Sequence, residues 1–272
     1  MEFGMSTASL FGRMTTEQAL SKLGEMSIPC SEIFLSTFQE YQADFAKLLY
    51  DIAQKHHIHI TAVHPFSLGF EPQLFSSYER SRQDAFQIYR QVLQSAKILH
   101  ADKYVMHGLA NVKHIDPKSL DIRKMAKYLD VAADMAADYG VKLAYENVHW
   151  CFFAFPEFAQ RLLDAIRSTN LYFTLDIKQA AQSHYFYQEY FPYMAARLTN
   201  VHLCDYHITG QAVQTLLPFQ GDVDFNELFS LLHQSGFDGS MMLEVYASDY
   251  HGVDELLQNY HHLQQVIALY WN

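Results

Sequence analysis

The sequence predicts an α/β protein, a single (β/α)8 TIM barrel that spans residues 1–272. Short β-rich segments alternate with longer segments of helical periodicity along the whole chain, which is typical of parallel α/β folds. Eight such units fit a length of 272 residues, close to the roughly 250 residues usual for this barrel. Half of the residues are hydrophobic and no linker rich in glycine, serine or proline interrupts the pattern, so we expect one domain with one large core.

Eight segments have the character of buried strands: residues 2–6, 32–36, 58–64, 103–107, 141–147, 171–176, 198–205 and 240–246. An amphipathic segment follows each one, at residues 16–26, 40–56, 78–99, 120–139, 157–167, 187–195, 225–234 and 253–270. Two of the helix starts carry residues of a capping box, Thr15 with Gln18 and Asp224 with Glu227. Neither a G-x-G-x-x-G fingerprint nor a P-loop motif occurs, which disfavours an open dinucleotide-binding or nucleotide-binding sheet.

The charge balance argues against nucleic acid as a partner. The chain has 30 acidic and 19 basic residues, a net charge of -11, and no cluster of Lys and Arg. Because neutralisation of phosphates supplies most of the affinity for nucleic acids, we expect a small-molecule ligand instead. The longest apolar runs, such as residues 60–63 and 241–243, are far shorter than the roughly 20 residues that cross a membrane, so no membrane partner is expected.

The location is predicted to be cytoplasmic. The first six residues lack the basic and apolar regions of a signal peptide. The three cysteines, Cys30, Cys151 and Cys204, are an odd number without metal-knuckle spacing. We therefore expect reduced thiols that pack as small hydrophobic side chains.

Ionisable residues close four consecutive strand segments in the second half of the chain. Glu146 and Asp176 end the fifth and sixth segments, His202 lies within the seventh, and Glu244 follows the apolar residues of the eighth. Strand parity puts Glu146 on the same side as Ala144. If that side is the barrel interior, the four side chains converge at the carboxyl ends of the strands, where active sites of this fold lie.

Two glutamates, one aspartate and one imidazole form an oxygen-rich donor set that suits a divalent metal ion. Mn²⁺ is the first choice, and Zn²⁺, Co²⁺ and Mg²⁺ are alternatives. Three carboxylates buried together would repel one another and their pKa values would rise, whereas a divalent cation would keep them ionised. The alternative for any one residue is that it caps a strand or pairs with Lys or Arg, which explains four successive strands less well.

Further polar residues lie beside the expected metal ligands. His64 and His107 end the third and fourth segments, and they can bind substrate hydroxyls, hold a second metal ion or make structural hydrogen bonds. Asn147, His149 and His207 are candidate substrate-binding or supporting groups. Nearby aromatic residues can form a wall over a sugar or pack in the core: Trp150, Phe152, Phe153 and Phe155.

Short motifs follow one another in a specific order at the ends of the expected strands. They are Phe3-Gly4-Met5-Ser6-Thr7, Ala144-Tyr145-Glu146-Asn147, Thr174-Leu175-Asp176-Ile177, Val201-His202-Leu203-Cys204-Asp205, Pro218 with Gly221-Asp222-Val223-Asp224-Phe225, and Leu243-Glu244-Val245. By these motifs the chain resembles, essentially from end to end, the sugar phosphate isomerase/epimerase family of xylose isomerase-like TIM barrels. That superfamily also includes ketose 3-epimerases and endonuclease IV-like proteins.

The resemblance implies a metal-dependent isomerase or epimerase that acts on a sugar or sugar phosphate. It implies that the metal ligands are Glu146, Asp176, His202 and Glu244. It further implies proton transfer between neighbouring carbon atoms through an enediolate, with Glu146 and Glu244 as the catalytic acid and base on opposite sides of the sugar. The expected partner is a small-molecule carbohydrate substrate, and a homo-oligomer remains open.

The chain departs from the family at two places. Many members have a His three residues after the sixth-strand Asp, where this chain has Gln179, preceded by Lys178. Gln179 can hydrogen-bond a substrate hydroxyl but cannot carry a proton at neutral pH. Lys178 is either a contact for an anionic substrate group or a solvated lysine. Phe219 and Gln220 stand where members more often have a glycine after the proline.

Three other functions remain open from the sequence. A metal-dependent lyase or dehydratase acting on a keto-sugar or polyol derivative would begin with the same proton removal. An abasic-site endonuclease is disfavoured because Gln179 replaces a His of its three-metal site and because the chain is acidic. A non-catalytic sugar-binding barrel would use the same residues without turnover.

Overall fold

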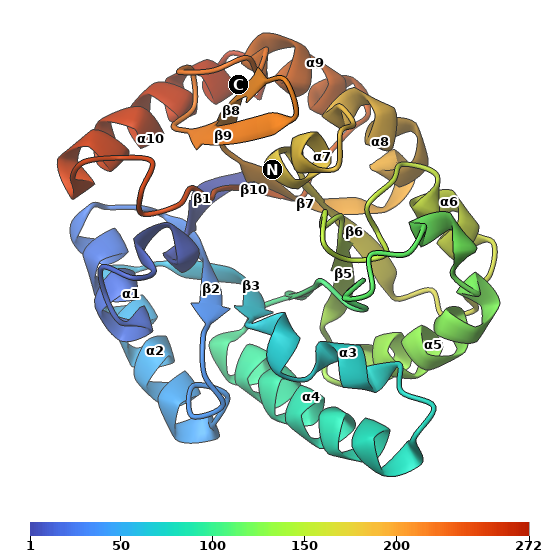
Figure 1. The fold of residues 1–272 in the computed structure, drawn as a ribbon. Coiled ribbons are helices and arrows are strands. Elements are labelled where there is room, and N and C mark those ends of the chain that lie inside the picture. Colours follow the sequence, from blue (N-terminus) through green and yellow to red (C-terminus); the bar gives the residue numbers. More distant parts are fainter. Residues whose placement is uncertain (272) are drawn as a thin grey trace.

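The computed structural model describes residues 1–271 and contains a closed barrel of parallel strands (Figure 1). Around the barrel the strands follow the order β1, β10, β7, β6, β5, β4, β3, β2, and β1 closes it by pairing with both β10 and β2. The bounds are Glu2–Ser6 (β1), Cys30–Leu35 (β2), His59–Pro65 (β3), Lys103–Met106 (β4), Lys142–Glu146 (β5), Leu171–Asp176 (β6), Leu198–Leu203 (β7) and Ser240–Leu243 (β10). The predicted (β/α)8 barrel is confirmed.

Helices surround the barrel and cover its outer face (Figure 1). They are α1 (Thr16–Glu25), α2 (Ala43–His56), α3 (Glu71–Leu74), α4 (Glu79–Leu99), α5 (Ile122–Asp138), α6 (Phe158–Leu163), α7 (Ile177–Gln182), α8 (Tyr187–Met194), α9 (Phe225–Gln234) and α10 (Val253–Ala268). Most predicted elements are found within a few residues of their expected bounds. The short helices α3 and α7 were not predicted, because neither is long enough to show a helical period.

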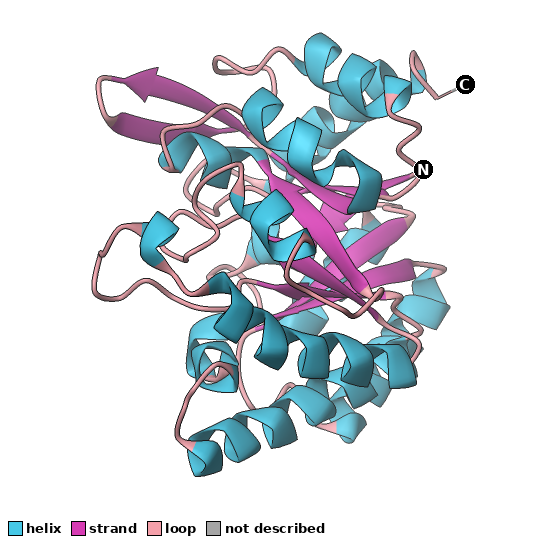
Figure 2. Ribbon diagram, turned by 90° about the vertical axis from the view of Figure 1, so that its right-hand side faces the viewer, coloured by secondary structure: helices cyan, strands magenta, loops and turns pink. Residues whose placement is uncertain are grey.

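A hairpin interrupts the predicted pattern after β7. Strands β8 (Asp205–Thr209) and β9 (Ala212–Leu216) pair antiparallel and project beyond the barrel (Figure 2). The predicted strand 198–205 therefore ends at Leu203. The cause is Asp205, whose carboxylate accepts hydrogen bonds from the backbone N–H groups of Tyr206, Gly221 and Val223 and so turns the chain. A side chain on Gly221 would collide with the carbonyl of Tyr206, so the base of the hairpin requires glycine.

One of the two predicted capping boxes is formed. At α1, the Oε1 atom of Gln18 accepts a hydrogen bond from the N–H of Thr15 at 3.1 Å. At α9, Asp224 accepts hydrogen bonds from two backbone N–H groups, but Glu227 does not reciprocate, because its carboxylate binds Gln188 Nε2 of α8 at 2.8 Å. The second capping box was therefore predicted wrongly for Glu227, because Gln188 of the neighbouring helix α8 competes for that side chain.

The interior of the barrel is polar, whereas the main apolar core lies between the strands and the helices. Ser240 Oγ of β10 donates to Asn200 Oδ1 of β7 at 2.7 Å, and Asn200 Nδ2 donates to Glu32 Oε2 of β2 at 2.9 Å. Because β7 and β2 are not neighbours in the barrel, the second bond crosses its interior. This buried polar chain lies beneath the carboxyl ends of the strands and supports them.

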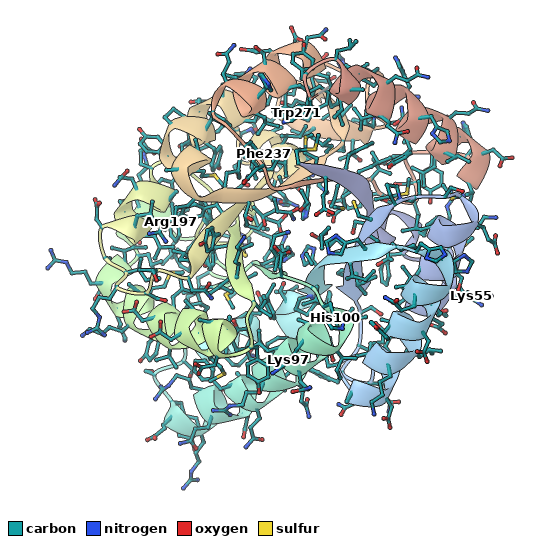
Figure 3. The ribbon with its side chains drawn as sticks, turned by 180° about the vertical axis from the view of Figure 1, so that it is seen from behind. Lys55, Lys97, His100, Arg197, Phe237 and Trp271 are labelled. Carbon is teal, nitrogen blue, oxygen red and sulfur yellow. The ribbon has the colours of Figure 1, made fainter. Side chains whose placement is uncertain are left out.

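The opposite end of the barrel carries the turns that lead from helices into strands. Figure 3 shows this end, with His100 after α4 and Phe237 after α9 labelled. The three cysteines are buried and unpaired, as predicted. Within residues 1–271, no helix combines the length and hydrophobicity needed to cross a membrane.

Candidate metal and active site

The four side chains predicted to converge do so at the carboxyl ends of their strands. Glu146 and Asp176 are the last residues of β5 and β6, His202 lies near the end of β7, and Glu244 directly follows β10. The Nδ1 atom of His202 lies 3.1 Å from Glu146 Oε1, 3.7 Å from Asp176 Oδ2 and 3.7 Å from Glu244 Oε1. One imidazole nitrogen therefore faces all three carboxylates.

One oxygen of each carboxylate accepts no hydrogen bond of regular geometry among residues 1–271, although His107 Nε2 lies 2.9 Å from that of Glu146 and Lys178 Nζ lies 3.3 Å from that of Asp176. These atoms are Glu146 Oε2, Asp176 Oδ2 and Glu244 Oε2, and all three are buried. A buried acceptor without a donor costs about 1–3 kcal/mol, and more when it is charged. A divalent cation would satisfy all three oxygens, so the residues present fit such an ion.

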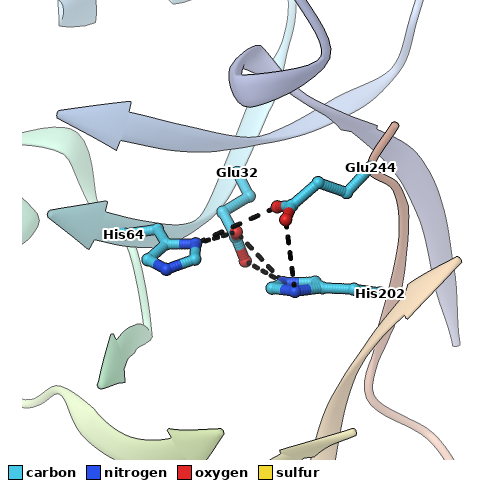
Figure 4. A group of neighbouring side chains, drawn as sticks. All are labelled: Glu32, His64, His202 and Glu244. Atoms are coloured by element: carbon cyan, nitrogen blue, oxygen red, sulfur yellow. Dashed lines mark hydrogen bonds and ion pairs between the residues drawn. The ribbon is translucent and has the colours of Figure 1, made fainter. Parts of the chain in front are cut away.

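Glu32 of β2 completes the cluster and was not predicted from the sequence. Its buried carboxylate lies 3.0 Å from His64 Nδ1 and 3.1 Å from His202 Nε2 (Figure 4). Because Glu32 engages the Nε2 side of His202, the Nδ1 atom of that ring is left to face the other carboxylates. Glu32 escaped notice because it lies near the start of its strand. The available signal was a charged residue next to the apolar run Ile33-Phe34-Leu35.

These contacts shift the protonation of the buried groups. Burial raises the pKa of Glu32, but His202 and His64 outweigh it and hold the pKa below its usual range. Burial lowers the pKa of His64, yet its hydrogen bond to Glu32 and the charges of Glu146 and Glu244 raise the pKa to about 9. Burial likewise lowers the pKa of His202, but the negative charges of Glu244, Glu32 and Glu146 raise this pKa well above its usual value. In the protein alone, the two histidines therefore supply positive charge among the carboxylates.

Replacing Glu32 by Gln should lower the free energy of unfolding by about 3–5 kcal/mol, because removal of one partner leaves the other buried groups uncompensated. Urea denaturation measures the loss. Glu2→Gln is the matched control, since Glu2 pairs with His59 at 2.7 Å on the surface. That change should cost less than about 1 kcal/mol. Equal stability of the Glu32 variant and the wild type would show that the buried contacts of Glu32 do not stabilise the barrel.

A second group of potential ligand atoms lies beside the first. His107 Nε2 is 2.9 Å from Glu146 Oε2 and 2.8 Å from His64 Nε2, and His64 Nε2 is 3.6 Å from Glu146 Oε2. The Oγ atom of Ser67 lies 2.7 Å from His107 Nδ1 and orients that ring. Two imidazole nitrogens and a carboxylate oxygen at these distances can bind a second cation or the hydroxyl groups of a substrate.

Lys178 and Gln179 line the cavity from the first turn of α7. The Nζ atom of Lys178 is buried, 3.3 Å from Asp176 Oδ2 and 3.7 Å from Glu244 Oε1. Burial favours the neutral amine, but Asp176 and Glu244 raise the pKa of Lys178 well above its usual value, so the side chain stays a cation. The alternative of a solvated lysine is therefore wrong.

The remaining candidates lie in different surroundings. Asn147 is buried and uses both ends of its amide on Asp176, donating to the backbone carbonyl at 2.9 Å and accepting from the N–H at 2.8 Å. His149 is exposed, and its Nδ1 atom lies 2.6 Å from Gln179 Oε1, which orients Gln179. His207 is exposed on β8 and pairs with Asp222 at 2.9 Å. The structure thus does not bring Asn147, His149 or His207 into the lining of the cavity.

A cavity of about 220 Å³ opens above the cluster at the carboxyl end of the barrel. His64, His107, Glu146, Lys178, Gln179 and Glu244 contribute its polar lining. Of the four aromatic residues that the sequence offered as a wall, Trp150 lines the cavity. The other three are buried in the core, as the alternative predicted: Phe152, Phe153 and Phe155.

Comparisons with known proteins agree with this architecture. A family model described as xylose isomerase-like TIM barrel matches residues 21–266. The chain is similar to the solved structure of the IolI protein with a bound zinc atom, at 19% identity and a TM-score of 0.82 with 99% of each chain covered. A D-tagatose 3-epimerase-like protein shows 20% identity and a TM-score of 0.74, with 100% of this chain and 97% of that chain covered. The D-psicose 3-epimerase from Clostridium cellulolyticum H10 shows 15% identity and a TM-score of 0.78, with 99% of each chain covered. No protein in the curated set matches the chain.

Proposed function

Because this chain belongs to the xylose isomerase-like TIM barrel family, we propose that it is a divalent-metal-dependent isomerase or epimerase of a sugar or sugar phosphate. One observation carries the proposal. Glu146 and Glu244 come from the ends of β5 and β10, three strands apart around the barrel, and they line the same cavity. Each has a buried carboxylate oxygen that accepts no hydrogen bond of regular geometry among residues 1–271. The similarity to structures described as 3-epimerases of ketoses supports the same class.

Glu146, Asp176, His202 and Glu244 would hold the metal ion, with His202 contributing its Nδ1 atom. When bound, the ion would polarise a substrate carbonyl and its neighbouring hydroxyl, which acidifies the C–H bond between them. The oxygen-rich donor set favours Mn²⁺, and Zn²⁺, Co²⁺ and Mg²⁺ remain alternatives.

Glu146 and Glu244 are the proposed acid and base. One carboxylate removes the proton from the carbon beside the carbonyl, and the resulting enediolate accepts a proton from the other glutamic acid. Return of the proton to the neighbouring carbon gives an isomer, and its return to the opposite face of the same carbon gives an epimer. Lys178 stays cationic and offsets the negative charge that develops on the enediolate. His64, His107 and Gln179 are placed to hydrogen-bond substrate hydroxyls.

Incubation of the Mn²⁺-supplemented protein with a panel of ketoses and their phosphates in D₂O tests this proposal. We expect deuterium at the carbon next to the carbonyl, detected by NMR, with the carbon skeleton retained. An unsaturated or cleaved product would instead identify a lyase. Efficient incision of abasic DNA, or the absence of exchange with every ketose and ketose phosphate of the panel, would contradict the proposal.

A further inference from the structure

The two proposed acid–base residues differ in how the fold holds them. Glu146 is the last residue of β5 and takes part in its pairing with β6. Glu244 lies beyond the last residue of β10 that pairs with β1 and β7, and it begins the connection 244–252, which contains no helix or strand. On the β7 side, the N–H of Glu244 still donates to the carbonyl of Leu203 at 2.9 Å. On the β1 side, the pairing has already ended.

The hydroxyl of Ser9 takes the place of a strand partner on the β1 side. Ser9 lies in the short 3₁₀ helix Thr7–Leu10, which follows β1. Its Oγ atom donates to the carbonyl of Leu243 at 3.1 Å and accepts from the N–H of Val245 at 3.3 Å. These groups belong to the two peptide units that flank Glu244. Because the planes of these units define φ and ψ of Glu244, one hydroxyl restrains the direction of its side chain.

Ser9 is itself held in place. It is fully buried, and the hydroxyl of Tyr250 donates to its carbonyl at 2.7 Å. Arg13 donates to the carbonyls of Ala247 and His251 at 3.2 and 3.0 Å. Its guanidinium lies 4.3 Å from the centre of the Tyr250 ring. The segment that follows β1 therefore contacts the connection that carries Glu244 at its start, in its middle and near its end.

We propose that Ser9 is a positioning residue that holds Glu244 in the geometry needed for metal binding and proton transfer. The inference rests on the proposed function, which makes Glu244 a metal ligand and one of the two acid–base groups. Ser9 acts through Glu244 rather than on the substrate, because it is fully buried and, unlike its neighbour Ala8, does not line the cavity. Without this hydroxyl, the carboxylate of Glu244 would spend less time beside the other ligands.

Amide hydrogen exchange of the metal-free protein, followed by NMR, tests the backbone part of the inference. In Ser9→Ala, the N–H groups of Glu244 and Val245 should exchange about fivefold faster or more, because the lost hydrogen bonds make local opening easier. Tyr250→Phe should give a smaller increase at the same two groups, and it serves as the test if Ser9→Ala does not fold. Ser95→Ala is the matched control, since Ser95 is buried on α4 and donates to a backbone carbonyl at 2.9 Å. It should leave both rates unchanged.

Titration with Mn²⁺, followed by the EPR signal of the free ion, tests the functional part. Ser9→Ala should bind Mn²⁺ about fivefold more weakly than the wild type, whereas Ser95→Ala should bind it equally well. In the Glu244→Gln background, Ser9→Ala should cause no further loss, because a residue that acts through the Glu244 carboxylate has nothing left to position. On a substrate that exchanges deuterium, Ser9→Ala at saturating Mn²⁺ should lower kcat about fivefold or more and change KM little.

Unchanged amide exchange at Glu244 and Val245 in both Ser9→Ala and Tyr250→Phe would overturn the inference. Faster exchange with an unchanged affinity for Mn²⁺ would also overturn it, because Ser9 would then stabilise the connection without positioning the carboxylate. Equal losses of affinity with and without the Glu244 carboxylate would do the same. Failure of the wild type to bind Mn²⁺ would instead refute the proposed metal centre. The exchange rates of the metal-free protein judge Ser9 separately, so the two failures are distinguishable.

Discussion

Glu146→Gln should lower turnover about 10³-fold, with Glu244→Gln close to it in effect. Gln preserves the shape of each side chain but cannot accept or return a proton, and general acid–base catalysis contributes about 10²–10⁴ to enzymatic rates. Because the two residues act in one proton-transfer sequence, the double variant should be hardly slower than the slower single variant. Initial rates on the substrate found by the exchange experiment measure these effects.

Asp51→Asn is the control for Glu146→Gln, since Asp51 is exposed on α2 and does not line the cavity. Its rate should equal that of the wild type. Because Glu146 is also a proposed metal ligand, the metal content of each variant must be measured by elemental analysis and restored before the rates are compared. Near-normal turnover of the Glu146 variant would remove this residue from the mechanism. Unchanged ligand affinity, with no turnover in either protein, would identify a sugar-binding barrel.

Removing divalent ions with a chelator should abolish turnover and lower the midpoint of thermal unfolding by about 5–10 °C. The physical reason is linkage: an ion present at 100 times its dissociation constant stabilises the folded state by about 2.7 kcal/mol. For a chain of this size, each kcal/mol shifts the midpoint by about 2–4 °C. The buried carboxylate oxygens of Glu146, Asp176 and Glu244 are the groups that would lose the cation.

Differential scanning fluorimetry and activity assays follow the removal, and re-addition of Mn²⁺, Co²⁺, Zn²⁺ or Mg²⁺ should restore both signals with different efficiency. Asp222→Asn, which alters an exposed carboxylate of the hairpin base, should respond to the chelator as the wild type does. Asp176→Asn should already have a low midpoint and respond little. Purified protein without metal, and with activity indifferent to chelators, would refute the proposed metal centre.

The sequence predicted the barrel and the convergence of four side chains because both depend on local pattern. Strand parity and the position at a strand end place Glu146 and Asp176 at the mouth, whatever the details of the loops. Glu32 was missed because its importance comes from contacts with His64 of the neighbouring strand β3 and with His202 across the barrel, which no local pattern reveals. Long-range partners of this kind become visible only when the strand order and register are known.

The hairpin and the environment of His207 also depended on tertiary structure. The proximity of His207 to His202 in the sequence suggested proximity in space, but the turn at Asp205 carries His207 away from the cavity lining to Asp222. Lys178 illustrates the opposite case. The sequence left open whether Lys178 is solvated or contacts the substrate, and its burial against Asp176 and Glu244 excludes the solvated alternative.

The side chain of Asn147 makes two hydrogen bonds to the backbone of Asp176, so the geometry of the carboxylates and the choice of substrate can change independently of each other. The spacing between the carboxylates of Glu146 and Asp176 depends on the pairing of β5 with β6 and on this amide side chain, rather than on the segments that connect the strands. Those segments can lengthen, shorten or exchange residues while the spacing between the carboxylates stays the same. Substrate choice can therefore diverge among descendants of this protein without any change in the reaction, and the same separation would let an engineer graft new loops onto an unaltered catalytic base.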